Sequence, residues 1–174
     1  MGSGINGAYA GTRGGSQPYA ETYHVVPEMM NADKKDPDIY DPNTGYFKNP
    51  SAISLREAIR NNRFYQRNGK KTEGEFTYVM DEEGNIIFGK RENPNDGRKR
   101  APHPTLIGGK DPQVQCVGII TFRDGKILSV DNQSGHYRPN IKSMAKVEAF
   151  LQKLYEENRL LFDKNSKWRQ RKSG

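Results

Sequence analysis

The sequence has a single cysteine and no long apolar run. Because Cys116 is the only cysteine among 174 residues, an internal disulfide and a zinc site built from several cysteines are both excluded. Cys116 lies in an apolar run typical of a strand, where we expect a buried and unreactive thiol. No stretch approaches the roughly 20 apolar residues that a membrane-spanning helix requires, so we expect no membrane span.

Several common motifs are also missing. The chain contains no GxxxxGK[ST], no HExxH and no GxSxG, and its one GxGxxG match, at residues 2–7 of the glycine-rich start, follows no predicted strand and opens no predicted helix. The local chemistry of P-loop NTPases, classical dehydrogenases, zincins and α/β-hydrolases is therefore absent. The spacing of the histidines is not specific for a metal, and we assign no metal ligands.

Apolar residues are scarce and positive charge is in excess. The hydrophobic share is 33% and the mean hydropathy is −0.97, so a compact core should coexist with long, solvated loops. Lys and Arg number 28 against 21 Asp and Glu, which gives a net charge of +7 and a pI near 9.4. This balance favours a polyanionic partner, either nucleic acid or an acidic protein.

The length fits one domain. Residues 1–20 contain six glycines and few apolar side chains, which predicts a flexible linker. We place a single domain at residues 21–174, ending in the basic tail KWRQRKSG, and we take the chain to be a monomer.

Two pairs of β-prone segments are each joined by a tight turn. Residues 76–80 and 85–88 flank Asp-Glu-Glu-Gly, and residues 114–122 and 126–130 flank Arg-Asp-Gly. Both patterns predict β-hairpins, and the longer segment is apolar on both alternate faces, as a central strand is. Residues 90–100 combine turn formers with five Lys or Arg, so a solvated loop and a phosphate-contacting loop both remain open.

Helix signals occur at two places. Ser54 and Glu57 have capping-box spacing, which predicts a helix that Gly69 ends. Asn140 can cap a second helix, whose apolar residues recur at intervals of three and four: Met144, Val147, Leu151 and Leu154.

The segments before these helices are less regular. Residues 23–26 form a strand candidate that Pro27 ends, and residues 28–50 are rich in turn dipeptides. The whole pattern predicts an α+β fold, with a small, twisted, mainly antiparallel sheet, about two helices and long loops.

Two histidines are the main candidates for chemistry, because imidazole transfers protons near neutral pH. His103 lies between two prolines that stiffen its backbone. His136 lies in Ser-Gly-His-Tyr-Arg-Pro, directly after a predicted strand, where Tyr137 could stack on a ring and Arg138 could grip phosphate. A structural turn with a buried histidine is the alternative for this hexapeptide.

Two further residues are open to either interpretation. Glu148 is expected at the border of the apolar face of its helix, where it could stabilise a developing cation or pair with a neighbouring Lys or Arg. His24 could be an ordinary strand residue or a member of the site.

The stretch His103-Pro-Thr-Leu-Ile-Gly-Gly109, the strand and turn after it, and Ser134-Gly-His-Tyr-Arg-Pro139 together resemble a known module. It occurs in C-terminal toxin domains of bacterial Rhs and other polymorphic toxins, and in plant calmodulin-binding proteins with an IQ motif. No IQ motif is visible here, which favours the toxin setting. The chain departs from the usual pattern at Pro104, where Ser is common.

The resemblance implies an effector delivered into the cytoplasm of a target cell in interbacterial competition, with a cognate acidic immunity protein as partner. Among such toxins, the polar set is similar to that of ADP-ribosyltransferases. It implies an ADP-ribosyltransferase-like core that uses NAD as substrate, with RNA or another macromolecule as acceptor. The catalytic residues would be His103, His136, Tyr137 and Glu148. The residues contacting NAD would be Thr105, Ser134, Gly135 and Arg138.

Two alternatives stay open. In a metal-independent ribonuclease toxin, His103 and His136 would act as general base and acid in attack of a 2′-hydroxyl on phosphate. In a non-enzymatic binding module, the Ser-Gly-His-Tyr-Arg-Pro turn would be purely structural.

Overall fold

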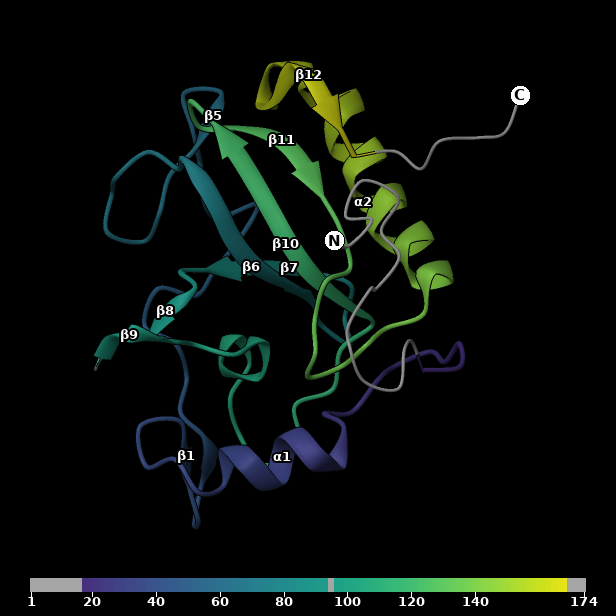
Figure 1. Ribbon diagram of the computed structural model, residues 1–174. Coiled ribbons are helices and arrows are strands. Elements are labelled where there is room, and N and C mark those ends of the chain that lie inside the picture. Colours follow the sequence, from purple (N-terminus) through teal and green to yellow (C-terminus); the bar gives the residue numbers. More distant parts are fainter. Residues whose placement is uncertain (1–16, 94–95, 169–174) are drawn as a thin grey trace.

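The structure is a computed structural model, and it describes residues 17–93 and 96–168. Its centre is a six-stranded sheet in the order β12-β11-β10-β6-β7-β3 (Figure 1). The strands are β3 (Ile53–Ser54), β6 (Gly74–Met80), β7 (Ile86–Gly89), β10 (Cys116–Arg123), β11 (Lys126–Val130) and β12 (Phe162–Lys167). All neighbours are antiparallel except β11 and β12. Both predicted hairpins are confirmed, because β6 pairs with β7 and β10 pairs with β11.

Side chains alternate across the sheet and divide the core in two. On β10, Cys116, Ile120 and Phe122 belong to one buried cluster, which also contains the inward residues of α2 (Met144–Glu157). Val117 of the same strand belongs to a second cluster on the opposite face, with Leu106 and Tyr137. This period of two lets β10 support a packed helix on one face and the predicted site segments on the other.

The helix after Asn140 is confirmed. Asn140 accepts a hydrogen bond from the backbone N–H of Lys142, and a short 3₁₀ turn, η3 (Ile141–Ser143), leads into α2. The other helix, α1 (Pro27–Asp33), falls where we expected loop. Pro27 occupies its first turn, where the missing N–H costs nothing, so this proline starts a helix instead of ending a strand. The preceding strand candidate is reduced to a single bridge between Tyr23 and Val114.

The helix predicted from Ser54 to Gly69 is wrong. The capping contacts form, since the Ser54 hydroxyl lies 3.2 Å from both the backbone nitrogen and Oε1 of Glu57. However, Asn61 and Asn62 have φ values of 50° and 64°, a left-handed pair that a helix does not accommodate. They instead join β4 (Ile59–Arg60) to β5 (Arg63–Phe64) as an antiparallel hairpin.

Short hairpins replace two other segments expected as loops. One joins β1 (Tyr40–Asp41) to β2 (Gly45–Tyr46), and the other joins β8 (Glu92–Asn93) to β9 (Asp96–Arg100). With two α-helices and a mainly antiparallel sheet, the predicted α+β class is nevertheless confirmed. No helix among the described residues is long and apolar enough to cross a membrane.

The chain ends lie mostly outside the described residues. Of the predicted linker, only residues 17–20 are described, and Gln17 donates its backbone N–H to the carbonyl of Arg138 at 2.7 Å. The basic tail is described only as far as Trp168, which packs against Tyr155 and Phe162. Cys116 is fully buried, and burial raises the pKa of its thiol to about 12, as expected for an unreactive cysteine.

Candidate functional site

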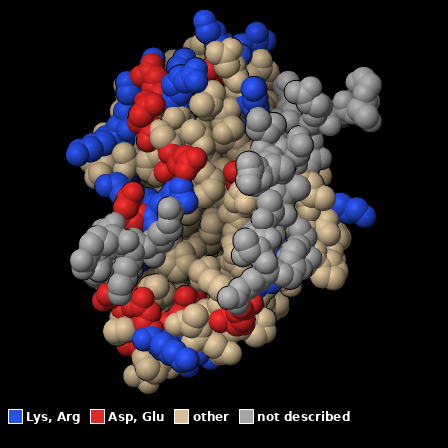
Figure 2. Space-filling view, viewed as in Figure 1, with Lys and Arg blue, Asp and Glu red and all other residues tan. Residues whose placement is uncertain are grey.

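The two predicted site segments approach each other across the face of the sheet opposite α2. His103 lies in η2 (His103–Leu106), a 3₁₀ turn whose Leu106 packs in the same cluster as Val117 and Tyr137. His136 lies in the turn after β11, close enough that its electrostatic interaction with His103 helps lower the pKa of His103. Figure 2 shows a hollow of mainly uncharged surface near the middle of the face seen in Figure 1, with acidic and basic side chains at its border.

His103 is held as a neutral imidazole. Its Nε2 lies 2.8 Å from the carbonyl oxygen of Gly118 and must carry the proton, because a carbonyl only accepts. Burial lowers the pKa of His103 to about 4, and the nearby charges of His136 and Arg91 act in the same direction. At neutral pH, Nδ1 of His103 is therefore the ring nitrogen with a lone pair, which is the arrangement of a general base.

His136 is oriented by a buried carboxylate. Its Nε2 lies 2.9 Å from Oδ2 of Asp33, the last residue of α1, and the hydroxyl of Tyr46 donates to the same oxygen at 2.5 Å. The side chains of His136 and Asp33 are 15% and 8% exposed, so water screens this pair weakly. An aspartate in this position fixes the ring and balances the charge of the imidazolium when it forms.

Arg91 adds a cation to the same neighbourhood. Its Nη1 pairs with Glu75 of β6, while its Nε is buried without a hydrogen-bond partner among the described residues. Arg91 also interacts electrostatically with Asp131, whose carboxyl has a raised pKa because it is largely buried. We call His103, His136, Asp33 and Arg91 the two-histidine site.

Sequence reasoning missed Asp33, Arg91 and Glu75. Asp33 lies 103 residues before His136 in the chain, and no local spacing connects them. The run of Lys and Arg at residues 90–100 did raise a phosphate-contacting loop as one possibility, and Arg91 is the member of that run with a described place near His103. Only the folded chain brings these residues together.

Tyr137 and its neighbours hold the turn together. The Tyr137 ring is fully buried, its hydroxyl donates to the carbonyl of Pro112 at 2.7 Å, and its pKa is raised by burial. Ser134 accepts from the backbone N–H of Tyr137 at 3.3 Å. A ring without exposed surface cannot stack on a ligand in this conformation, so stacking by Tyr137 would require the turn to open.

Arg138 and Gly135 complete this turn. Arg138 has a left-handed φ of 44°, and its guanidinium reaches Glu28 of α1 at 2.9 Å. Its Nε also donates to the carbonyl of Gly135 at 3.3 Å. Arg138 therefore ties the turn to α1 in this conformation, and Gly135 itself is exposed.

The other predicted residues lie in different surroundings. Thr105 is buried and donates its hydroxyl to the carbonyl of Pro102 at 2.7 Å. Glu148 is half-buried on α2, the helix that packs on the opposite face of the sheet, and no described contact joins it to His103 or His136. His24 pairs with Asp111 at 2.9 Å on the surface, with side chains 60% and 55% exposed.

No family model, no curated protein and no solved structure matches this chain. Among the described residues, no group of three or more His, Cys, Asp or Glu is arranged to hold a metal ion.

The neutral state of His103 predicts acid sensitivity. Its pKa falls from 6.5 to about 4 on folding, so the unfolded chain binds more protons between these values and stability decreases as pH falls through that window. At 1.36 kcal/mol per pKa unit, the loss between pH 7 and pH 5 is about 2 kcal/mol. Urea unfolding at both pH values should show this loss in the wild type and not in His103→Gln, which keeps a donor for Gly118 but does not titrate. An equal pH dependence in both proteins would contradict the burial of a neutral His103.

Proposed function

We propose that this domain is a metal-independent ribonuclease of the toxin type, with the two-histidine site as its catalytic centre. The observation that carries the proposal is that two neighbouring histidines lie in different chemical surroundings. His103 is neutral with its proton fixed on Nε2, whereas His136 lies beside the carboxylate of Asp33. His103 thus keeps a lone pair at Nδ1, which a general base requires, and the Asp33 carboxylate can balance the charge of an imidazolium at His136.

The proposed reaction is transfer of the phosphodiester to the neighbouring 2′-oxygen. Nδ1 of His103 removes the proton of the 2′-hydroxyl as that oxygen forms a bond to phosphorus. The bond from phosphorus to the 5′-oxygen breaks, and protonated His136 gives its proton to that leaving oxygen. The products are a 2′,3′-cyclic phosphate and a free 5′-hydroxyl, and no water or metal is consumed in this step.

Arg91 supports the same reaction electrostatically. Negative charge accumulates on the non-bridging oxygens as phosphorus becomes five-coordinate, and a guanidinium beside them lowers the energy of that state. The buried Nε of Arg91 has no described partner, which is costly unless a ligand oxygen supplies one. The net charge of +7 would further favour association with RNA.

ADP-ribosyl transfer from NAD is the second candidate. The observation that favours it is the proximity of two carboxylates, Glu75 and Asp131, to Arg91, as their electrostatic interactions indicate. One of them could stabilise an oxocarbenium-like ribose in place of Glu148. The burial of Tyr137 argues against the stacking that this reaction would ask of it.

One experiment separates the two candidates. Purified protein is incubated with a fluorescently labelled single-stranded RNA in EDTA without NAD, and in parallel with labelled NAD and cell extract. The ribonuclease proposal expects cyclic-phosphate products in the first reaction and a loss of about 10²-fold or more in His103→Ala and in His136→Ala. The matched control is His24→Ala, which removes an exposed histidine that also pairs with an aspartate. Intact RNA together with consumption of NAD would favour the second candidate and refute the first.

A further inference from the structure

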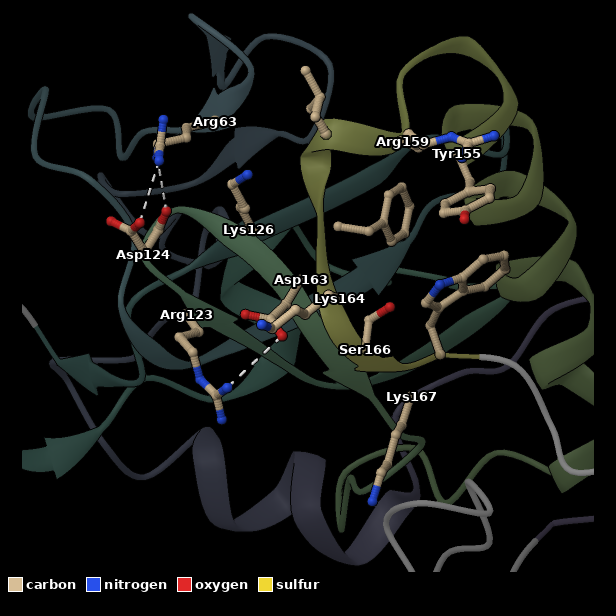
Figure 3. A pocket seen from close by; sticks show the side chains of 13 residues that line it. Arg63, Arg123, Asp124, Lys126, Tyr155, Arg159, Asp163, Lys164, Ser166 and Lys167 are labelled. Carbon is tan, nitrogen blue, oxygen red and sulfur yellow. Dashed lines mark hydrogen bonds and ion pairs between the residues drawn. The ribbon is translucent and has the colours of Figure 1, made fainter.

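A large basic groove lies at the end of the sheet where β10 turns into β11. Its volume is about 950 Å³, and its walls come from that turn, from the end of α2, from η4 (Arg159–Leu161) and from β12 (Figure 3). Six cationic side chains line it: Arg63, Arg123, Lys126, Arg159, Lys164 and Lys167. Two acidic residues, Asp124 and Asp163, are the only carboxylates in the described lining.

Most of this positive charge is not paired with a carboxylate of the described residues. Asp124 pairs with Arg63 and with Lys71, and Asp163 pairs with Arg123 at 3.7 Å. No carboxylate of the described residues pairs with the other four cations of the groove, which are Lys126, Arg159, Lys164 and Lys167. Four cations around one concavity repel each other, so the groove is prepared for an anionic ligand with several charges.

An aromatic cluster supports one wall of the groove. The Trp168 ring lies 5.3 Å from that of Phe162 and 5.9 Å from that of Tyr155, and Phe162 and Trp168 are each about 5% exposed or less. The guanidinium of Arg159 lies over the Tyr155 ring at 5.9 Å. Packed rings hold β12 and η4 in place, so the backbone that carries these cations needs little ordering when a ligand binds.

We propose that this groove binds the phosphodiester backbone of single-stranded RNA. Single-strand sites follow the phosphate backbone with a positively charged groove and stack bases on aromatic side chains, and Tyr155 is the half-buried aromatic residue of this lining. Lysines also occur on edge strands to prevent strand pairing, but that role requires only exposure and does not require cations from four other elements, β5, β10, β11 and η4, to converge. Duplex RNA is recognised over about 16 base pairs, far more than this groove can hold.

The groove and the two-histidine site both adjoin β10, but at different positions along this strand. Gly118, whose carbonyl accepts from His103, and Arg123 of the groove lie five positions apart on β10. At about 3.3 Å per residue this is roughly 17 Å. RNA binding here goes beyond the proposed cleavage reaction, because it requires neither histidine.

The test measures binding of an RNA that cannot be cleaved. Fluorescence anisotropy is recorded with a labelled single-stranded 2′-O-methyl oligonucleotide at several salt concentrations. The groove variant carries Lys126→Gln, Arg159→Gln and Lys164→Gln. The matched control carries Lys34→Gln, Lys35→Gln and Lys48→Gln, which remove the same charge from exposed positions outside the groove.

The groove variant is expected to bind about 10-fold more weakly or worse, and its slope of log affinity against log salt should be smaller by about 2, since single strands contribute about 0.7 per phosphate contact. The control should stay within about 2-fold of the wild type. Equal weakening in both variants, or equally tight binding of a mononucleotide or an acidic peptide, would overturn the proposal. A protein that binds the oligonucleotide in the groove but leaves cleavable RNA intact would refute only the proposed ribonuclease activity.

Discussion

Replacement of Asp33 by asparagine is expected to lower the rate of RNA cleavage by about 10²–10⁴-fold. The Asp33 carboxylate accepts hydrogen bonds from both His136 and Tyr46. An amide of the same shape would hold the ring poorly and would not balance the imidazolium charge, and loss of an orienting aspartate costs up to about 10⁴-fold in catalysis by comparable triads. The rate is measured from cyclic-phosphate formation at saturating RNA, so that a change in binding is not mistaken for a change in chemistry.

The control for Asp33→Asn is Asp111→Asn. Both aspartates lie 2.9 Å from a histidine nitrogen, but the pair of His24 and Asp111 is exposed and the pair of His136 and Asp33 is buried. Asp111→Asn should leave the rate within about 2-fold of the wild type, because exposed ion pairs contribute little. Similar rates in Asp33→Asn and the wild type, in proteins with unchanged thermal unfolding, would remove His136 from the mechanism.

Replacement of Gly118 by alanine is expected to destabilise the fold by about 3 kcal/mol or more. A Cβ atom at this position would lie 1.8 Å from the carbonyl oxygen of Asp131. That backbone cannot easily move, because three hydrogen bonds hold Asp131. Its N–H donates to the carbonyl of Ile119 at 3.0 Å, and its carboxylate accepts from the N–H of Ile119 at 2.9 Å. The hydroxyl of Tyr78 donates to the carbonyl of Asp131 at 2.7 Å. For a chain of this size, thermal unfolding should shift down by about 6–12 °C.

Gly89→Ala is the matched strand variant. Its added Cβ would also lie close to neighbouring atoms, but those atoms are Cδ2 of Leu106 and Oγ of Ser51, both 2.8 Å away and both in side chains instead of backbone. We expect a loss about half as large or less. A Gly118→Ala protein that unfolds at the wild-type temperature would show that the chain after β11 does not cross β10 this closely.

The sequence was sufficient for the elements whose signals are local. The two hairpins of the central sheet combine β-prone runs with Gly-containing turns, and α2 combines a capping asparagine with an apolar stripe that packs on the sheet. Local propensity and tertiary packing agree in these segments, so the prediction from spacing is confirmed.

Local signals misled the prediction where tertiary packing chose between alternatives. Ser54 and Glu57 make their capping contacts, but Asn61 and Asn62 turn the chain into a hairpin instead of a helix. Pro27 reads equally as the end of a strand and as the first turn of a helix. In each case a local signal permitted two structures, and the residues farther along the chain decided between them.

The site divides in the same way. The sequence by itself singled out His103 and His136 as the candidate proton carriers of this basic chain. Only the tertiary structure placed Asp33 against His136, buried His103 as a neutral ring on the carbonyl of Gly118, enclosed Tyr137, and put Glu148 on the helix of the opposite face. The physical reason is that hydrogen bonds, burial and charge proximity depend on distances in space, and contacts across about 100 residues leave no trace in local spacing.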